Sequence, residues 1–273
     1  MWHFASVDLV LMYAAAVGIL GWRRLSEGTA ERSGIRLAMY LAALVGLGLC
    51  VSSPLDRLSM EWLTWHMVIH VVEMFYLPLL LVLSAPRVFF VSALPTPARR
   101  IGRQIRDGLR GPLSALGRPV VAVVGFSAVM VFWHIPGVFA WAMANMWSHD
   151  WLMLPSFVAV GIGFWRVIVV VPPRARVAGS RFQIVAVLGT SFVMLVLAMA
   201  MAIVAHTPWY PSYVALHGAT GALRDQHYAA GVLWICGYLW AIPALVVIGT
   251  RVLSARGGAS VAVDRFFGRS EAL

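Results

Sequence analysis

Long apolar runs separated by short polar segments dominate the pattern of this chain. About seven of them approach or exceed the length that a helix needs to cross the hydrocarbon of a bilayer. Polar and apolar residues do not alternate within the runs, so a membrane β-barrel is excluded and helices remain to satisfy the backbone in lipid. The pattern predicts an all-α, polytopic integral membrane bundle with transmembrane helices at residues 6–22, 35–53, 62–83, 119–142, 151–171, 182–205 and 227–250.

Arginine sets the expected direction of the chain in the membrane. Arginines cluster after the first, third, fifth and seventh runs, whereas the alternate segments hold only Arg57 and Arg224. The positive-inside rule then places the N-terminus outside and the C-terminus in the cytoplasm. No internal repeat stands out, so we predict a single membrane domain over residues 1–273, in which 251–273 form a cytoplasmic tail.

Composition agrees with a membrane protein, because 61% of the residues are hydrophobic and 12% are charged. The chain has no lysine, and its 21 basic residues are all arginine against 11 acidic ones, which gives a formal net charge of +10. Arginine in short loops between apolar helices favours contact with membrane lipid, and we expect no nucleic-acid partner. The N-terminus lacks a basic region, so no cleaved signal peptide is expected.

Polar residues interrupt the third run and mark the first candidate site. His66, His70 and Glu73 fall on one face of a helix, and Met67 borders it. Such groups are costly in hydrocarbon unless they are paired, so an intramembrane imidazole pair beside a carboxylate indicates function. Two imidazoles one turn apart suit a metal ion or haem iron, and the alternative is that each histidine hydrogen-bonds across helices.

A second feature is Trp133-His-Ile-Pro136 in the fourth run. Pro136 cannot donate to the carbonyl of Phe132, so we predict a kink beside His134. The kink would turn His134 towards the bundle axis as a ligand, or the histidine would satisfy the freed carbonyl. Both interpretations stay open from the sequence.

The predicted topology gathers all eight histidines on the outer side, including His149 before the fifth run and His227 at the start of the seventh. Asp225 precedes His227, where an acidic side chain suits the positive end of a helix, so we predict that Asp225 caps the seventh helix. Several methionines lie on the same side. Imidazole and thioether together are ligands that suit copper.

Several motifs, in order along the chain, resemble the CtaG family of cytochrome c oxidase assembly proteins, the seven-helix bacterial type associated with caa-type oxidases. They are Ser53-Pro-Leu-Asp56, His66-Met-Val-Ile-His70, Pro78 to Pro86, Trp133-His-Ile-Pro136, Gly163-Phe-Trp165, Tyr210-Pro-Ser-Tyr213 and Asp225-Gln226 through Trp234. Three positions depart from the family pattern: Ile69 replaces a glutamine, Met153 or Leu154 stands where a second histidine often follows His149, and His227 replaces a glutamine.

The resemblance implies a multi-pass protein of the bacterial cell membrane that helps to assemble a haem-copper oxidase, through copper supply to its catalytic subunit. We expect no enzyme activity and no catalytic residues. Our hypothesis is a transient copper site formed by His66, His70 and His134, with Met67 or His149 as a further ligand. Glu73 and Asp225 are the candidates for accepting an imidazole N–H or a released proton.

Three alternatives remain at this stage. A membrane redox protein would use His70 and His134 as axial haem ligands. A channel or transporter would pass protons or metal ions along Glu73, although the inner halves of the runs offer few polar groups. A structural clamp would hold an oxidase subunit without any metal.

Overall fold

The computed structural model describes residues 2–25, 34–109, 118–169 and 178–255. Every regular element in these ranges is a helix, which confirms the all-α prediction. The α-helices are α1 (Trp2–Arg23), α2 (Gly34–Ser52), α3 (Pro54–Glu61), α4 (Leu63–Val71), α5 (Leu77–Ser84), α6 (Arg87–Ala93), α7 (Thr96–Leu109), α8 (Pro119–His134), α9 (Pro136–Ala144), α10 (Met146–Ser148), α11 (Leu154–Ile168), α12 (Ser180–Met199) and α13 (Pro211–Ala255).

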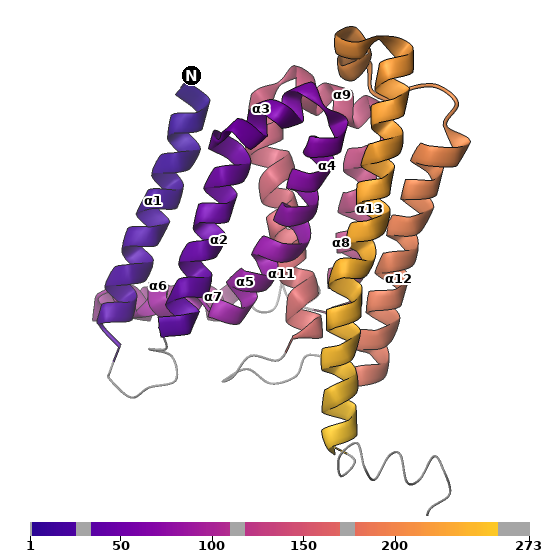
Figure 1. Ribbon diagram of the computed structural model, residues 1–273. Coiled ribbons are helices and arrows are strands. Elements are labelled where there is room, and N and C mark those ends of the chain that lie inside the picture. Colours follow the sequence, from indigo (N-terminus) through magenta and orange to yellow (C-terminus); the bar gives the residue numbers. More distant parts are fainter. Residues whose placement is uncertain (1, 26–33, 110–117, 170–177, 256–273) are drawn as a thin grey trace, which may run out of the picture.

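Three short π-helical segments continue α-helices: η2 (Val72–Tyr76) joins α4 to α5, η4 (His149–Met153) joins α10 to α11, and η5 (Ala200–Val204) extends α12 and ends before a non-helical segment at 205–210. Long helices therefore run side by side through the molecule (Figure 1). The N-terminus, α3 and α9 lie at one end, which we call the α3 end, and α6 and α7 lie at the other, the α6 end (Figure 1).

Five helical stretches within the described residues are long and apolar enough to cross a membrane, so this is a multi-pass membrane protein. They are Gly34–Ser52, Leu63–Ser84, Met146–Ile168, Ser180–Val204 and Pro211–Ser254, and the bent pair α8 and α9 makes a sixth if it counts as one span. The first predicted span coincides with α1, which is outside this set. The count of seven and the direction of crossing stay predictions.

The fourth predicted span is broken rather than merely kinked. The axes of α8 and α9 differ by 73°. Ile135, between them, has an extended backbone with ψ of 123°. Proline excludes the helical conformation from the residue before it, so Pro136 explains the position of the break.

α13 comprises two helices, one from Pro211 and a second that begins after Gly218, still earlier than the predicted start at His227. It contains one break at Gly218, whose φ of +67° is open to glycine without strain. Asp225 therefore lies inside a helix, and the prediction that it caps the seventh helix is wrong. The chain continues as helix to Ala255, and the rest of the predicted cytoplasmic tail lies outside the described residues.

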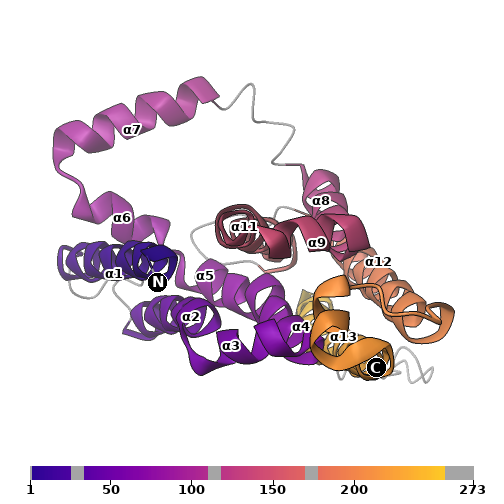
Figure 2. The same cartoon turned by 90° about the horizontal axis from the view of Figure 1, so that it is seen from above.

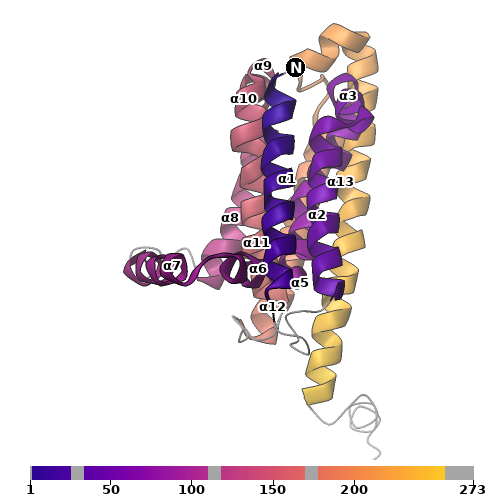
Figure 3. The same cartoon turned by 90° about the vertical axis from the view of Figure 1, so that its left-hand side faces the viewer.

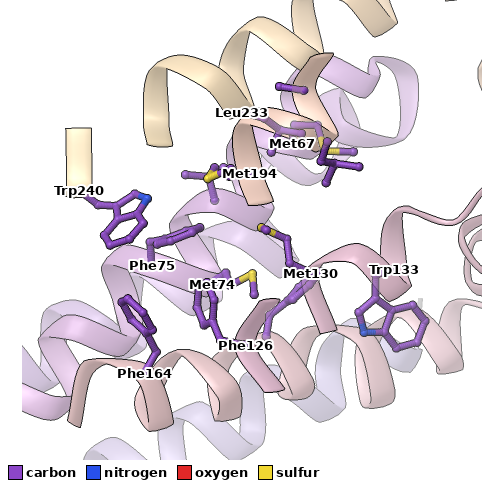
Figure 4. Close-up of a cluster of buried hydrophobic side chains, with 14 of the residues drawn as sticks. Met67, Met74, Phe75, Phe126, Met130, Trp133, Phe164, Met194, Leu233 and Trp240 are labelled. Carbon is purple, nitrogen blue, oxygen red and sulfur yellow. The ribbon is translucent and has the colours of Figure 1, made fainter. Parts of the chain in front are cut away.

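One large apolar core joins α4, η2, α8, α11, α12 and α13. Figure 4 shows its centre, where rings alternate with flexible methionine side chains. Phe75 stacks on Trp240 with ring centroids 4.8 Å apart, and Phe126 meets Phe164 at 4.7 Å. These contacts pack η2, which continues α4, against α13, and α8 against α11.

The arginine-rich stretch between the third and fourth spans forms two helices, where the sequence analysis assigned none. α6 packs on α1, and its Phe89 is fully buried. Ser92 Oγ donates a hydrogen bond of 2.6 Å to the Gly21 carbonyl. α7 then projects away from the bundle, roughly perpendicular to α1 (Figures 2 and 3).

Candidate metal centre

His66 and His70 lie one turn apart on α4, as the spacing predicts, and their rings face one another. The two Nε2 atoms are 2.6 Å apart. Both side chains are buried, with 1% and 4% of the residue exposed. Two imidazoles therefore turn the same kind of ring nitrogen towards one point inside the bundle.

Glu73 lies in η2, one turn below His70. Its Oε2 atom accepts a hydrogen bond of 3.0 Å from His70 Nδ1. The Nδ1–H tautomer leaves the His70 Nε2 lone pair directed at His66, which is the tautomer that metal ligation at Nε2 requires. The prediction that Glu73 accepts an imidazole N–H agrees with this geometry.

η4 supplies a second histidine–carboxylate pair. His149 Nδ1 lies 2.9 Å from Asp150 Oδ1, and both side chains are buried. His149 Nε2 is buried and has no hydrogen-bond partner among the described residues. A carboxylate therefore orients this imidazole too, and its other nitrogen is free to bind a ligand.

The three imidazoles form one group, with a ligand nitrogen of His66, His70 and His149 all within 4.8 Å of one another. The His149 ring centroid lies 5.5 Å from that of His66 and 5.7 Å from that of His70. Phe139 and Phe157 pack on the rings of His66 and His70 with centroids 5.0 and 4.9 Å apart. The group is thus enclosed by apolar rings, away from water.

The geometry fits a small metal ion. Three neutral imidazoles suit copper or zinc, and an ion bound to two nitrogens at about 2.0 Å each holds them about 3.3 Å apart at a tetrahedral angle. The His66 and His70 nitrogens at 2.6 Å need only a small ring rotation to reach that separation.

His134 and Met67 stand apart from this group. His134 Nε2 lies 3.2 Å from Met67 Sδ, and His134 Nδ1 lies 2.6 Å from the Met130 carbonyl oxygen. His134 therefore bonds to Met130 rather than to Phe132, whose carbonyl accepts from Ile135. Of the ligands predicted from the sequence, the structure brings together His66, His70 and His149, and it pairs His134 with Met67 beside them.

Asp225 does not contact an imidazole but caps α4. Its Oδ2 atom accepts from the Leu63 N–H at 2.6 Å, and its Oδ1 atom accepts from the Thr64 N–H at 3.2 Å and the Thr64 hydroxyl at 2.5 Å. A carboxylate at the first turn satisfies backbone groups and suits the helix dipole. Asp225 thus sets where the histidine-bearing helix begins.

Replacing Asp225 by alanine should lower the free energy of unfolding by about 2 kcal/mol, because two buried N–H groups at the start of α4 lose their acceptor. Thermal unfolding of the purified protein, followed by helical circular dichroism, measures the change. Glu61→Ala is the matched control, since Glu61 is exposed at the preceding turn. Equal midpoints for the two variants would contradict the capping role.

Both π-helical segments of the site precede a proline by two residues, Pro78 after η2 and Pro155 after η4. A proline has no N–H for the carbonyl four residues before it, and its ring crowds that carbonyl, so a wider turn relieves the helix there. The indole of Trp165 donates to the Phe75 carbonyl in η2 at 2.6 Å. Proline and tryptophan thus stabilise the turn that holds Glu73.

A cavity of about 330 Å³ lies between α1, α2 and α11. Apolar side chains line most of it, and Glu73 and Asp150 form part of its wall. Glu73 Oε1 and Asp150 Oδ2 are buried without hydrogen-bond partners among the described residues. The two carboxylates therefore connect the imidazole group to this cavity.

The family model of the cytochrome c oxidase caa3 assembly factor matches residues 11–255. The chain belongs to this CtaG family. The match covers the whole imidazole group and every candidate span after α1, and it confirms the resemblance found in the sequence. Family membership fits a multi-pass protein of the bacterial cell membrane.

Curated relatives of this CtaG family member include one protein of Mycobacterium bovis and one of Mycobacterium tuberculosis, both named only as uncharacterized proteins. Each is 24% identical over 262 residues, which cover 92% of this chain and 39% of the relative. The chain thus spans about two fifths of the length of these relatives. No solved structure matches.

Asp150 was not predicted from the sequence as a part of the site. The signal was its place directly after His149, followed by the proline that widens the turn. Without that widened turn, the relation between the His149 ring and its neighbouring carboxylate cannot be read from the spacing.

Proposed function

We propose that this CtaG family member binds a copper ion at His66, His70 and His149 and passes it to the catalytic subunit of a haem-copper oxidase during assembly. The observation that carries the proposal is the pair of buried imidazoles, His70 and His149, each backed by a carboxylate at Nδ1. Carboxylate-backed imidazoles that converge through Nε2 are typical of metal sites. Family membership supports the link to an oxidase.

Copper is the ion that the surroundings favour. Imidazole binds copper in either oxidation state, and the Met67 thioether beside His134 offers a softer second position next to the group. A donor that must release its ion benefits from few ligands, because the acceptor's ligands can then replace them one at a time. Three imidazoles without a thiolate meet that need.

The geometry supports a metal ion better than a haem. Axial ligation by His70 and His134 requires their Nε2 atoms to face one iron from opposite sides of a porphyrin. Instead, His70 Nε2 faces His66 Nε2 at 2.6 Å, and His134 Nε2 faces Met67 Sδ at 3.2 Å. An absorption spectrum without a Soret band would agree with the copper proposal.

The test combines binding and delivery in one pair of variants. The double variant His66→Gln/His70→Gln should lose Cu(I) from the purified full chain, because two of the three convergent nitrogens are removed. In cells that depend on this protein for oxidase assembly, the copper content of the oxidase should fall with it. Anaerobic titration against a Cu(I) chelator, repeated with Zn(II), measures the binding and its metal preference.

The control is His206→Gln/His227→Gln, which removes two exposed histidines outside the group. Unchanged copper binding in the His66/His70 variant would remove the proposed site. Lost binding with normal oxidase copper would remove the delivery role. A folded variant that keeps copper but fails to assemble the oxidase would favour the structural clamp.

A further inference from the structure

The helix α7 is the least expected element of the fold, and its sequence is divided into two faces. On a helical wheel Ala98, Ile101 and Ile105 share one side, at the spacings i, i+3 and i+7. The arginines fall on the opposite side, and Gln104 lies at the border between the two faces. α7 is therefore strongly amphipathic although it is too short and too polar to span a membrane.

The apolar face of α7 has no cover within the described part of the chain. Ile101 and Ile105 are 56% and 58% exposed. Figure 2 shows α7 standing outside the ring of spanning helices. Leu94, at the joint between α6 and α7, is also 41% exposed and continues the apolar surface.

The polar face carries most of the charge. The sequence of α7 has four arginines and one aspartate. Arg99 is held at the joint, where Nε donates to the Leu94 carbonyl at 2.8 Å and a terminal nitrogen donates to the Ser92 carbonyl at 2.8 Å. Arg100 and Arg103 extend from the exposed side further along the helix. The positive charge thus complements an anionic surface rather than a neutral one.

The position of α7 matches the surface of the membrane. It lies at the α6 end, roughly perpendicular to the spanning helices, and so it runs along the plane of the bilayer (Figure 3). α6 anchors its start, because Phe89 and Ser92 pack against α1. A helix held in that plane with one apolar and one cationic face fits the boundary between headgroups and acyl chains.

We propose that α7 is an interfacial helix that binds the anionic lipid surface at the α6 end of the bundle. Ile101 and Ile105 insert into the acyl boundary, and Arg100 and Arg103 contact lipid phosphates. The proposal is independent of the copper site, which lies towards the other end of the bundle.

The test uses the full chain in nanodiscs of phosphatidylcholine and phosphatidylglycerol. A spin label is placed at Ile105→Cys or at the polar-face control Arg103→Cys, after Cys50 and Cys236, the free cysteines of the described chain, are replaced by alanine. The label at position 105 should lie about 5–10 Å below the lipid phosphates and meet oxygen more than a water-soluble nickel chelate. The label at position 103 should show the opposite preference.

A second measurement tests the charge. Arg100→Gln/Arg103→Gln should weaken retention of phosphatidylglycerol about 25-fold, since each arginine near an anionic surface contributes about five-fold. Arg57→Gln/Arg224→Gln, exposed and at the α3 end, is the matched control and should change retention little.

Three outcomes would overturn the proposal. Equal access of the nickel chelate to both labels would place α7 in water. A label at 105 shielded from both reagents would mean that protein covers the apolar face. Unchanged retention of phosphatidylglycerol in the Arg100/Arg103 variant would remove the anionic preference.

Discussion

Replacing His149 by alanine should lower the affinity of the purified protein for Cu(I) by at least about 100-fold. Loss of a residue that only hydrogen-bonds to a metal ligand already costs about 10–100-fold in affinity, and His149 is proposed as a ligand itself. His149 is the third member of the imidazole group, and its free Nε2 is directed at no other described atom within hydrogen-bond distance. Chelator competition under anaerobic conditions measures the affinity.

The matched variant is His134→Ala. His134 is equally buried, but its ring nitrogens are directed at Met130 and Met67 rather than at the imidazole group. Its loss should therefore change the affinity much less than the loss of His149. The reverse order, with His134 dominant, would contradict the site drawn from the structure and restore the ligand set predicted from the sequence.

The second large effect is expected at Gly161, where α11 crosses η2. A Cβ atom there would meet the Met74 carbonyl oxygen and lie 2.6 Å from Pro78 Cγ. Neither a backbone oxygen nor a proline ring can move aside easily, so Gly161→Ala should lower the free energy of unfolding by about 3 kcal/mol, the upper end for overpacking. Denaturant-induced loss of helical signal in detergent measures it.

Gly163→Ala on the same helix is the control. Its new Cβ would meet only Ala122 Cβ, at 3.7 Å, which is ordinary van der Waals contact. Because alanine lowers the backbone entropy of the unfolded chain, the Gly163→Ala variant should have a free energy of unfolding equal to or above that of the parent protein. If both variants unfold at the same denaturant concentration, the close approach of α11 to η2 is not what holds this crossing.

Much of the fold was predictable from apolar length alone. The predicted run at 62–83 and the observed helical stretch Leu63–Ser84 differ by one residue at each end, and the run at 35–53 corresponds to Gly34–Ser52. Such runs have one solution in lipid, since every backbone group must be satisfied within the segment. Because the third run must be helical, the spacing of His66, His70 and Glu73 predicted that they share one face.

Apolar length predicted the helices less well where a helix continues into polar sequence and where a proline breaks it. Asp225 was predicted to begin a helix because the apolar run begins after it, but a helix in water continues through polar residues, and the helix that carries Asp225 begins after the break at Gly218. The helix α7 was not predicted, because its 14 residues are rich in arginine and do not resemble a membrane span. The 73° break at Pro136 was predicted only as a kink, because spacing alone does not give the size of the bend.

The π-helical turns have a consequence for how this family can vary. η2 and η4 each hold one residue more per turn than an α-helix, and between them they carry Glu73, His149 and Asp150. Deleting a single residue from either turn would restore α-helical winding with little rotation of the flanking helices, because the wider turn absorbs the extra residue, but it would move the carboxylate or imidazole that the turn carries away from the imidazole group. We therefore expect homologues that bind the same ion to keep the same number of residues in η2 and η4, so that they align through these two turns without gaps.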